Sequence, residues 1–349
     1  MRGLIAVPIF IAVTALSWGT YGVAVHTGQL ALGTSEMDVE TKKIVQSVFA
    51  FICVGAAYFL VAVVIPMLRL KTKGEQGSWT VRGTVTSLIA GCVGALGALG
   101  IVIAFAAGGS PLYVMPLVFG GAPVVNTFVS MVFAKAYKDV RPLFLLGLAL
   151  VITGAVLVLV YAPHGAAHGP QVEPNHPMII GAIFMTALCW GSYGPVLHKG
   201  QAAMKGSRLR PFVCVGLSYI LVAVILPIAW MATQGYSLTT GWTGTGITWA
   251  LVGGGVGAIG ALGVIFAFNF GGKPVFVMPL VFGGAPVVNT LTKLAISLSK
   301  GEELVIPMFF YVGLATVILG AVLTLVFAPR GGKPAAAAEK KQSAAAATT

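Results

Sequence analysis

Two fourteen-residue stretches of the sequence are identical and combine prolines, glycines and an amide. VMPLVFGGAPVVNT occupies 114–127 and recurs unchanged at 277–290. In a helix each proline lacks an N–H donor, so backbone polar groups within the stretch need other partners. We expect these groups and the following amide to bind the hydroxyls of a polar solute; the alternative is a kinked helix that packs through its glycines. The candidates are Pro116, Gly120, Gly121, Asn126, Pro279, Gly283, Gly284 and Asn289.

A second repeated motif places flat aromatic rings beside small polar residues, because WGTYG begins at Trp18 and WGSYG at Trp190. Aromatic faces next to hydrogen-bonding groups suit a polar ring such as a sugar, whereas Trp, Tyr and His also gather where a helix leaves a membrane. His26 and His198 lie near the ends of apolar runs, so we expect them at such an interface. The residues that we expect to face a cavity are Trp18, Tyr21, Trp190 and Tyr193.

These motifs lie in a chain that is too apolar for a water-soluble fold. Of 349 residues, 57% are hydrophobic and 9% are charged, whereas soluble domains carry about 25% charged residues. Ten apolar runs are long enough to cross roughly 30 Å of hydrocarbon. The sequence therefore predicts an all-α integral membrane protein with ten transmembrane helices. The predicted spans are 4–25, 44–68, 84–106, 111–134, 142–162, 178–197, 211–232, 246–269, 274–297 and 305–328.

The basic residues fall mainly on one side of this arrangement. Of 21 Lys and Arg, 17 lie outside the spans on one side and three (Lys42, Lys43 and Lys300) on the other, with Lys293 inside the ninth span. Cytoplasmic loops carry such an excess, which predicts a multi-pass protein of the cell (inner or plasma) membrane with both termini in the cytoplasm. The net charge of +12 is then a topology signal, and no nucleic-acid partner is expected. We expect the Lys293 side chain to reach the outer interface, with contact to an anionic solute as the alternative.

The two halves of the sequence are copies of each other. Besides the motifs above, Tyr58 and Pro66 recur as Tyr219 and Pro227. Five helices per copy is an odd number, so the second copy must enter the membrane from the opposite face, as in many secondary transporters. The expected units are two inverted-topology five-helix repeats at 1–163 and 178–329, an extracytoplasmic linker at 164–177 and a disordered cytoplasmic tail at 330–349.

On these features the sequence resembles the ten-helix drug/metabolite transporter superfamily over residues 4–328. The prolines of the fourth and ninth helices and the glycines at 146–154 and 312–320 carry the resemblance, and the WGTYG and WGSYG motifs are similar to those of its sugar-porter branch. The resemblance implies that helices 1, 3, 4, 6, 8 and 9 line a central cavity and that helices 5 and 10 are peripheral. Members often carry a glutamate just before helix 5, where this sequence has only Asp139.

The residue types that the predicted spans and motifs lack exclude several classes of function. No Asp or Glu lies in any predicted span, which counts against carboxylate-based proton or cation coupling. No motif of a hydrolase or an ATPase occurs, so neither catalytic residues nor a cofactor are expected. His164, His168, Glu173 and His176 could form a zinc site, but we expect these loop residues to be solvated and predict no metal.

The sequence thus predicts a secondary transporter that moves a small polar organic solute, first of all a sugar, by alternating access. An ion or divalent-cation channel or carrier is the alternative, and a non-transporting membrane scaffold or receptor is a third class. The expected partners are the solute and membrane lipid, and a homodimer is left open.

Overall fold

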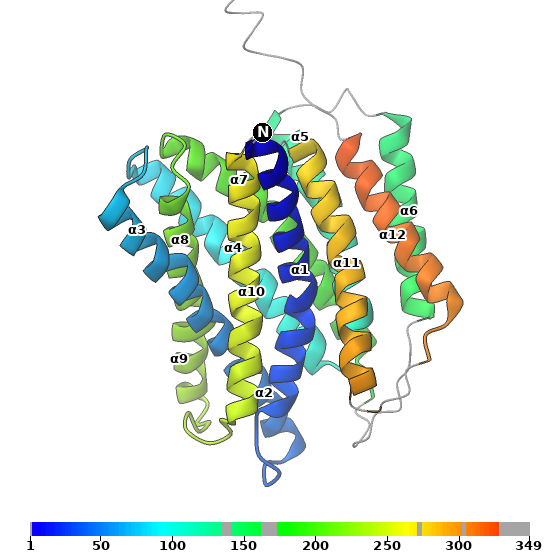
Figure 1. Cartoon of the computed structure of the whole chain (residues 1–349). Coiled ribbons are helices and arrows are strands. Elements are labelled where there is room, and N and C mark those ends of the chain that lie inside the picture. Colours follow the sequence, from blue (N-terminus) through cyan, green and yellow to red (C-terminus); the bar gives the residue numbers. More distant parts are fainter. Residues whose placement is uncertain are drawn as a thin grey trace, which may run out of the picture.

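The computed structural model describes residues 2–134, 141–161, 173–270, 274–299, 301 and 305–327. All regular structure in this part of the chain is helical (Figure 1). Ten segments within it are long and apolar enough to cross a membrane, which confirms the predicted multi-pass, all-α architecture. The helices are α1 (Arg2–Ala31), α2 (Val39–Phe59), α3 (Ile65–Lys73), α4 (Val81–Ala106), α5 (Pro111–Ala134), α6 (Pro142–Val160), α7 (His176–Ala203), α8 (Leu209–Tyr219), α9 (Leu226–Thr233), α10 (Gly244–Asn269), α11 (Pro274–Ser299) and α12 (Met308–Val326).

The first and sixth spans extend further than their apolar runs, so the predicted ends at 25 and 197 are wrong by six residues each. Helix α1 continues to Ala31, where the Thr243 hydroxyl donates to the Ala31 carbonyl at 2.6 Å. Helix α7 continues to Ala203, whose carbonyl accepts from the Thr80 hydroxyl at 2.9 Å. Threonines that precede α10 and α4 therefore satisfy carbonyls that a helix end leaves without partners, which hydrophobicity alone does not indicate.

The second and seventh spans each contain a wide π turn. The turns η1 (Leu60–Val64) and η2 (Ile220–Ile225) separate α2 from α3 and α8 from α9. Pro66 and Pro227 follow them after one residue, and a proline ring collides with the carbonyl four residues earlier. Widening the turn relieves this collision.

The prolines of the fourth and ninth spans do not interrupt their helices. Helices α5 and α11 run unbroken through their internal prolines. Each proline removes one hydrogen bond from the helix, and the rest of the ladder holds it together. The interruptions lie in the spans with η1 and η2 instead.

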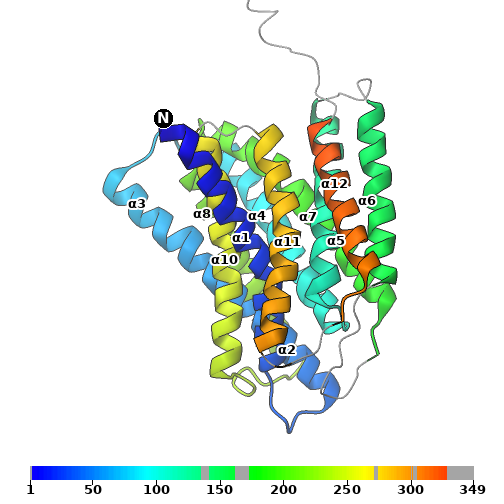
Figure 2. The same ribbon diagram turned by 45° about the vertical axis from the view of Figure 1, so that its right-hand side comes forward.

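Glycines bring the helices into close contact. Helix α1 packs along α10 and α4 along α7, while α6 and α12 pair with each other. In the last pair, Gly154 faces the backbone of Val317 and Gly320 faces the backbone of Val151, so no side chain fits between them. Small residues permit such close approach in membranes. The α6–α12 pair lies at the edge of the bundle (Figure 2).

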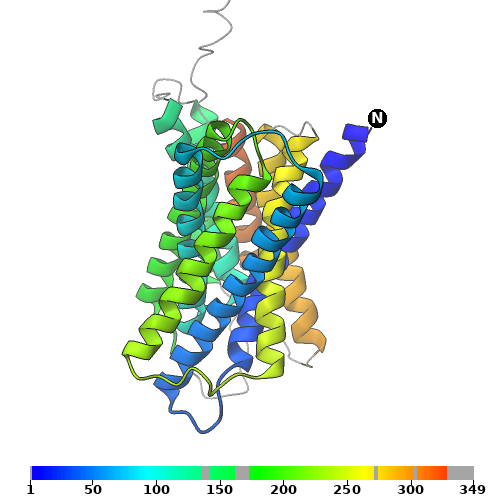
Figure 3. The same ribbon diagram turned by 90° about the vertical axis from the view of Figure 1, so that its left-hand side faces the viewer.

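The two ends of the bundle are held by different contacts. On the side where α1 begins, called here the N-terminal side, the α3–α4 and α7–α8 connections meet (Figure 3). There the Glu75 carboxylate accepts from the Ser207 hydroxyl at 2.6 Å and from two backbone N–H groups at the start of α8, and it lies 3.7 Å from Arg210. On the opposite, far side the Gly33 N–H donates to the Gly241 carbonyl at 2.8 Å. Most of the predicted linker and the whole tail lie outside the described residues.

Candidate functional site

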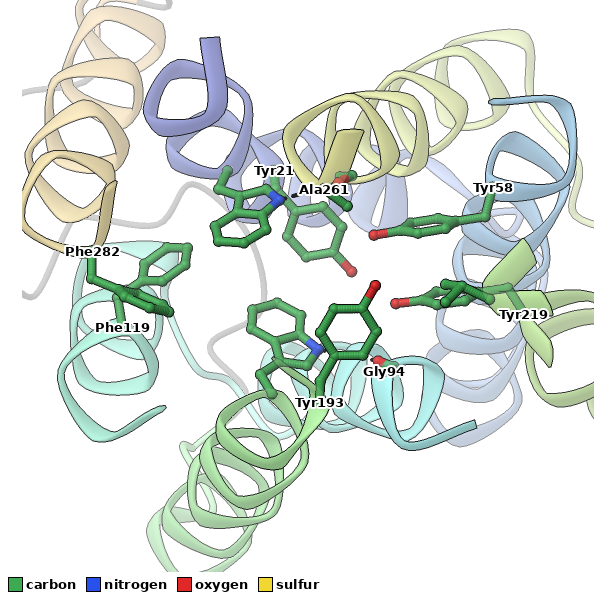
Figure 4. A pocket seen from close by; sticks show the side chains of 12 residues that line it. Tyr21, Tyr58, Gly94, Phe119, Tyr193, Tyr219, Ala261 and Phe282 are labelled. Carbon is green, nitrogen blue, oxygen red and sulfur yellow. Dashed lines mark hydrogen bonds between the residues drawn. The ribbon is translucent and has the colours of Figure 1, made fainter. Parts of the chain in front are cut away.

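A cavity of about 70 Å³ lies in the middle of the bundle, and eight of its twelve lining residues are aromatic (Figure 4). The aromatic lining comes from α1, α2, α5, α7, α8 and α11, and none of the twelve side chains carries a formal charge. We call this set the aromatic cavity. It comprises Trp18, Tyr21, Tyr58, Gly94, Phe119, Trp190, Tyr193, Val215, Tyr219, Gly257, Ala261 and Phe282.

Two tryptophans are fixed in the wall by hydrogen bonds to neighbouring helices. The indole N–H of Trp18 donates to the Gly257 carbonyl at 3.2 Å, and that of Trp190 donates to the Gly94 carbonyl at 3.1 Å. A Cβ at Gly260 would collide with the Trp18 ring. The glycines of α4 and α10 thus make room for the indoles, and the N–H groups are already engaged.

Four tyrosine hydroxyls converge at one end of the cavity, those of Tyr21, Tyr58, Tyr193 and Tyr219 (Figure 4). Tyr58 and Tyr219 stack in parallel across the crossing of α2 and α8. The buried Tyr21 hydroxyl has no hydrogen-bond partner among the described residues. A buried hydroxyl without a partner is unfavourable, so this end of the cavity favours a ligand with hydrogen-bonding groups.

The identical stretches reach the cavity through their phenylalanines. Phe119 of α5 and Phe282 of α11 lie with ring centroids 6.3 Å apart at the end opposite the tyrosines (Figure 4). The glycines that follow them face neighbouring helices: a Cβ at Gly120 would collide with Val317, and one at Gly121 would lie 3.2 Å from Ala187. In α11 a Cβ at the matching Gly283 or Gly284 would lie 3.3 Å from the side chain of Ile318 or Ala15.

The other candidates of these stretches also lie outside the cavity lining. The Asn289 amide is buried and donates to the carbonyl of Pro111, the first residue of α5, at 2.7 Å. Asn126 is partly exposed. Pro116 is buried within α5, and Pro279 lies in α11, where its side chain is not among those described. Direct binding of a solute by these groups stays a prediction, and the Asn289 amide joins α11 to α5.

Residues expected at the membrane interface are spread over several helices. His26 is partly exposed with its ring centroid 4.8 Å from that of Phe105, and His198 is exposed. Lys293 is partly exposed in α11. His164 and His168 lie outside the described residues, and within those described no three metal-binding side chains gather.

Sequence reasoning found the tryptophans and two of the tyrosines but missed four aromatic residues of the lining. Tyr58 and Tyr219 were visible as a repeated pair, yet only their positions beside the π turns bring them to the cavity. Phe119 and Phe282 lie inside the identical stretches, each directly before the two glycines that were selected as candidates. A search for aromatic residues repeated in both halves would have found all four.

Comparison with known proteins adds the fold but no function. No protein-family model matches the chain, and no curated protein does. Among solved structures, one described only as "Crystal structure of protein" is 17% identical, with a TM-score of 0.54, over 93% of this chain and 99% of that one. The likeness establishes the fold alone.

Proposed function

We propose that the protein is a secondary transporter that carries a small polar organic solute through the aromatic cavity by alternating access. The observation that carries the proposal is a difference between matched residues. Gly22 of α1 is buried, and a Cβ there would collide with the Met115 side chain of α5. The matched Gly194 of α7 is exposed, and only Asn126 Oδ1, at 3.4 Å, lies within 4 Å of its Cβ position.

The same difference recurs at two further pairs. Tyr21 is 3% exposed and Asn289 fully buried, whereas the matched Tyr193 and Asn126 are partly exposed. Because α1 approaches the far side after Tyr21 and α7 approaches the N-terminal side after Tyr193, the bundle is packed more tightly toward the far side. Exchange of these two arrangements between the halves would open the cavity to the other side.

An inverted repeat supports this exchange, because contacts between the halves occur in matched pairs. The Trp18–Gly257 bond has its counterpart in Trp190–Gly94. Thr14 likewise donates to the Gly260 carbonyl at 3.2 Å, and the Thr186 hydroxyl donates to the Gly97 carbonyl at 3.1 Å. Because the contacts are equivalent, the two halves can exchange conformations and still use the same pairs of residues at their interface. With the basic residues inside, the N-terminal side would face the cytoplasm of the cell membrane.

A sugar is the first solute that we propose. Flat indole and phenol faces suit the apolar face of a sugar ring, and four converging hydroxyls can exchange hydrogen bonds with its own. The absence of charge from the lining argues against anions and against a divalent-cation path, since such ions need charged or several oxygen ligands.

A quaternary ammonium solute is the second candidate, favoured by the eight aromatic side chains of the lining. A cation over aromatic faces is stabilised by about 0.5–2 kcal/mol per contact without any carboxylate. Such a solute has no N–H donors, so it requires no hydrogen-bond acceptor from the lining.

A thermal-shift panel of sugars and quaternary ammonium compounds on the purified protein tests both candidates, followed by flux of any hit into proteoliposomes. A bound solute raises the unfolding temperature by mass action. A sugar or ammonium hit that is bound but never crosses the bilayer would identify a receptor and refute transport. Stabilisation that persists when Trp18 and Trp190 are both replaced by alanine would refute the aromatic cavity as the site.

A further inference from the structure

A groove of about 600 Å³ lies on the N-terminal side, away from the aromatic cavity. One wall is apolar, formed by η1 and α3, with Met67 and Leu68 exposed. Lys71 of α3, Arg210 at the start of α8 and the half-exposed Trp79 complete the lining. An apolar wall that ends in basic and indole groups matches the chemistry of a lipid at a membrane surface.

The arginine in this groove is held in place. Its guanidinium donates to the Gln76 carbonyl at 3.2 Å and to the Ser207 hydroxyl at 3.1 Å, and it pairs with Glu75. The Arg210 Nε is buried and has no hydrogen-bond partner within the described part of the chain. The groove therefore contains a fixed cation beside the exposed cation of Lys71.

The second half of the sequence provides an internal comparison. Three, five and seven residues after Pro66 stand Arg69, Lys71 and Lys73, whereas the same positions after Pro227 hold Trp230, Ala232 and Gln234. The equivalent surface on the far side therefore has the same π turn and proline without the basic residues. Arg69, Lys71 and Lys73 belong to the basic excess of the N-terminal side, and of these three only Lys71 lines the groove.

We propose that this groove binds an anionic phospholipid, with its phosphate at Lys71 and Arg210, its glycerol region beside Trp79, and an acyl chain along η1 and α3. The groove begins at the π turn that leads from Tyr58 to α3, so an occupied groove braces the helix that presents Tyr58 to the aromatic cavity. The proposal is independent of which solute the protein carries, and of whether it carries one.

The test uses the full chain, purified and stripped of lipid in a neutral detergent. Dibrominated phosphatidylglycerol and dibrominated phosphatidylcholine are titrated while tryptophan fluorescence is recorded. We expect phosphatidylglycerol to quench the fluorescence with about fivefold higher affinity than phosphatidylcholine, because one basic contact near a membrane surface provides about that much. The additional quenching by phosphatidylglycerol should vanish in Trp79→Phe. Lys71→Gln should remove the preference, and Lys73→Gln, the same change at an exposed neighbour outside the groove, should retain it.

Equal affinity for the two lipids would overturn the proposal. So would an equal loss in Lys71→Gln and Lys73→Gln, which would mean diffuse attraction to the whole basic surface. Complete competition by inorganic phosphate would assign the groove to a soluble anion instead. Both lysines are exposed, so these variants should fold, and an unchanged unfolding temperature in lipid-free detergent checks this.

Discussion

The rings of Tyr58 and Tyr219 stack with their centroids 3.7 Å apart and their planes 2° from parallel. They occupy matched positions in the two halves, so a residue here contacts its own counterpart. Close by, Gly55 faces the side chain of Val224 in η2, and Gly216 faces that of Val63 in η1. The crossing of the second and seventh spans thus holds two of the four cavity hydroxyls at a fixed separation.

Removing one of these hydroxyls should weaken solute binding while the stack remains. In Tyr58→Phe or Tyr219→Phe we expect about a fivefold loss of affinity for a hydroxylated solute, the value of one net hydrogen bond of about 1 kcal/mol. The thermal shift that the solute produces measures this. Tyr236→Phe, outside the cavity lining, is the matched control, and an equal loss there would contradict a direct role.

The two indole hydrogen bonds should contribute to stability as well as to the shape of the cavity. Trp18→Phe and Trp190→Phe each remove one bond to a glycine carbonyl, and we expect each to lower the free energy of unfolding by about 1 kcal/mol. Denaturation in mild detergent measures the change. The same change at the exposed Trp230 should have almost no effect on the free energy of unfolding. A loss of the same size there would show that the smaller ring, and not the lost hydrogen bond, causes the destabilisation.

Much of this architecture could be predicted from the sequence because apolar length and charge are local properties. The ten spans needed only that information. The aromatic cavity was half predicted, since Trp18 and Tyr21 form a recognisable motif. Tyr58 was missed because its place in the cavity depends on how the second span crosses the seventh, where η1 packs against α8 and η2 against α2.

The two matched glycines should respond oppositely to a large side chain. A Cβ at Gly22 collides with Met115, so Gly22→Leu should keep the far side open. A Cβ at Gly194 meets no collision, so the present conformation should accept Gly194→Leu, which should block closure of the N-terminal side. Both should abolish solute flux. Hydrogen–deuterium exchange of backbone amides should rise near the end of α1 and the start of α5 in Gly22→Leu and stay unchanged in Gly194→Leu.

Exchange patterns that rise together in both glycine variants would mean unfolding and not a trapped conformation. The corresponding alanine variants separate these outcomes. A methyl group at Gly194 meets only ordinary contact, so exchange should stay unchanged there, whereas one at Gly22 still collides with Met115, so exchange should rise.

The Asn289 amide should stabilise the far side. Asn289→Leu removes the bond to Pro111 and leaves a buried carbonyl without it, so we expect a loss of about 1–3 kcal/mol in the free energy of unfolding. Asn126→Leu should cost less because Asn126 is partly exposed. Equal losses would contradict the asymmetry, and full uptake by the folded double variant would exclude both amides from transport.

The Glu75 carboxylate should anchor the N-terminal side through α8. Glu75→Gln removes a negative charge beside two N–H groups at a helix start, where such charges are favourable, and it weakens the contacts to Ser207 and Arg210. We expect a loss of about 1–3 kcal/mol in the free energy of unfolding. Gln76→Ala, at the exposed neighbour, is the control. An equal loss of unfolding free energy in Gln76→Ala would show that the order of the loop, and not the Glu75 carboxylate, stabilises this side.

The uncharged lining of the aromatic cavity also has an electrical consequence. A charge that crosses the whole membrane potential gains or loses about 2.3 kcal/mol per 100 mV, but none of the twelve lining residues has a charge to move. The empty site should therefore return across the bilayer at a rate that voltage leaves unchanged. A neutral sugar that crosses alone should carry no current, whereas an ammonium compound that crosses alone should carry one. A recording from a planar bilayer would therefore distinguish the two solutes.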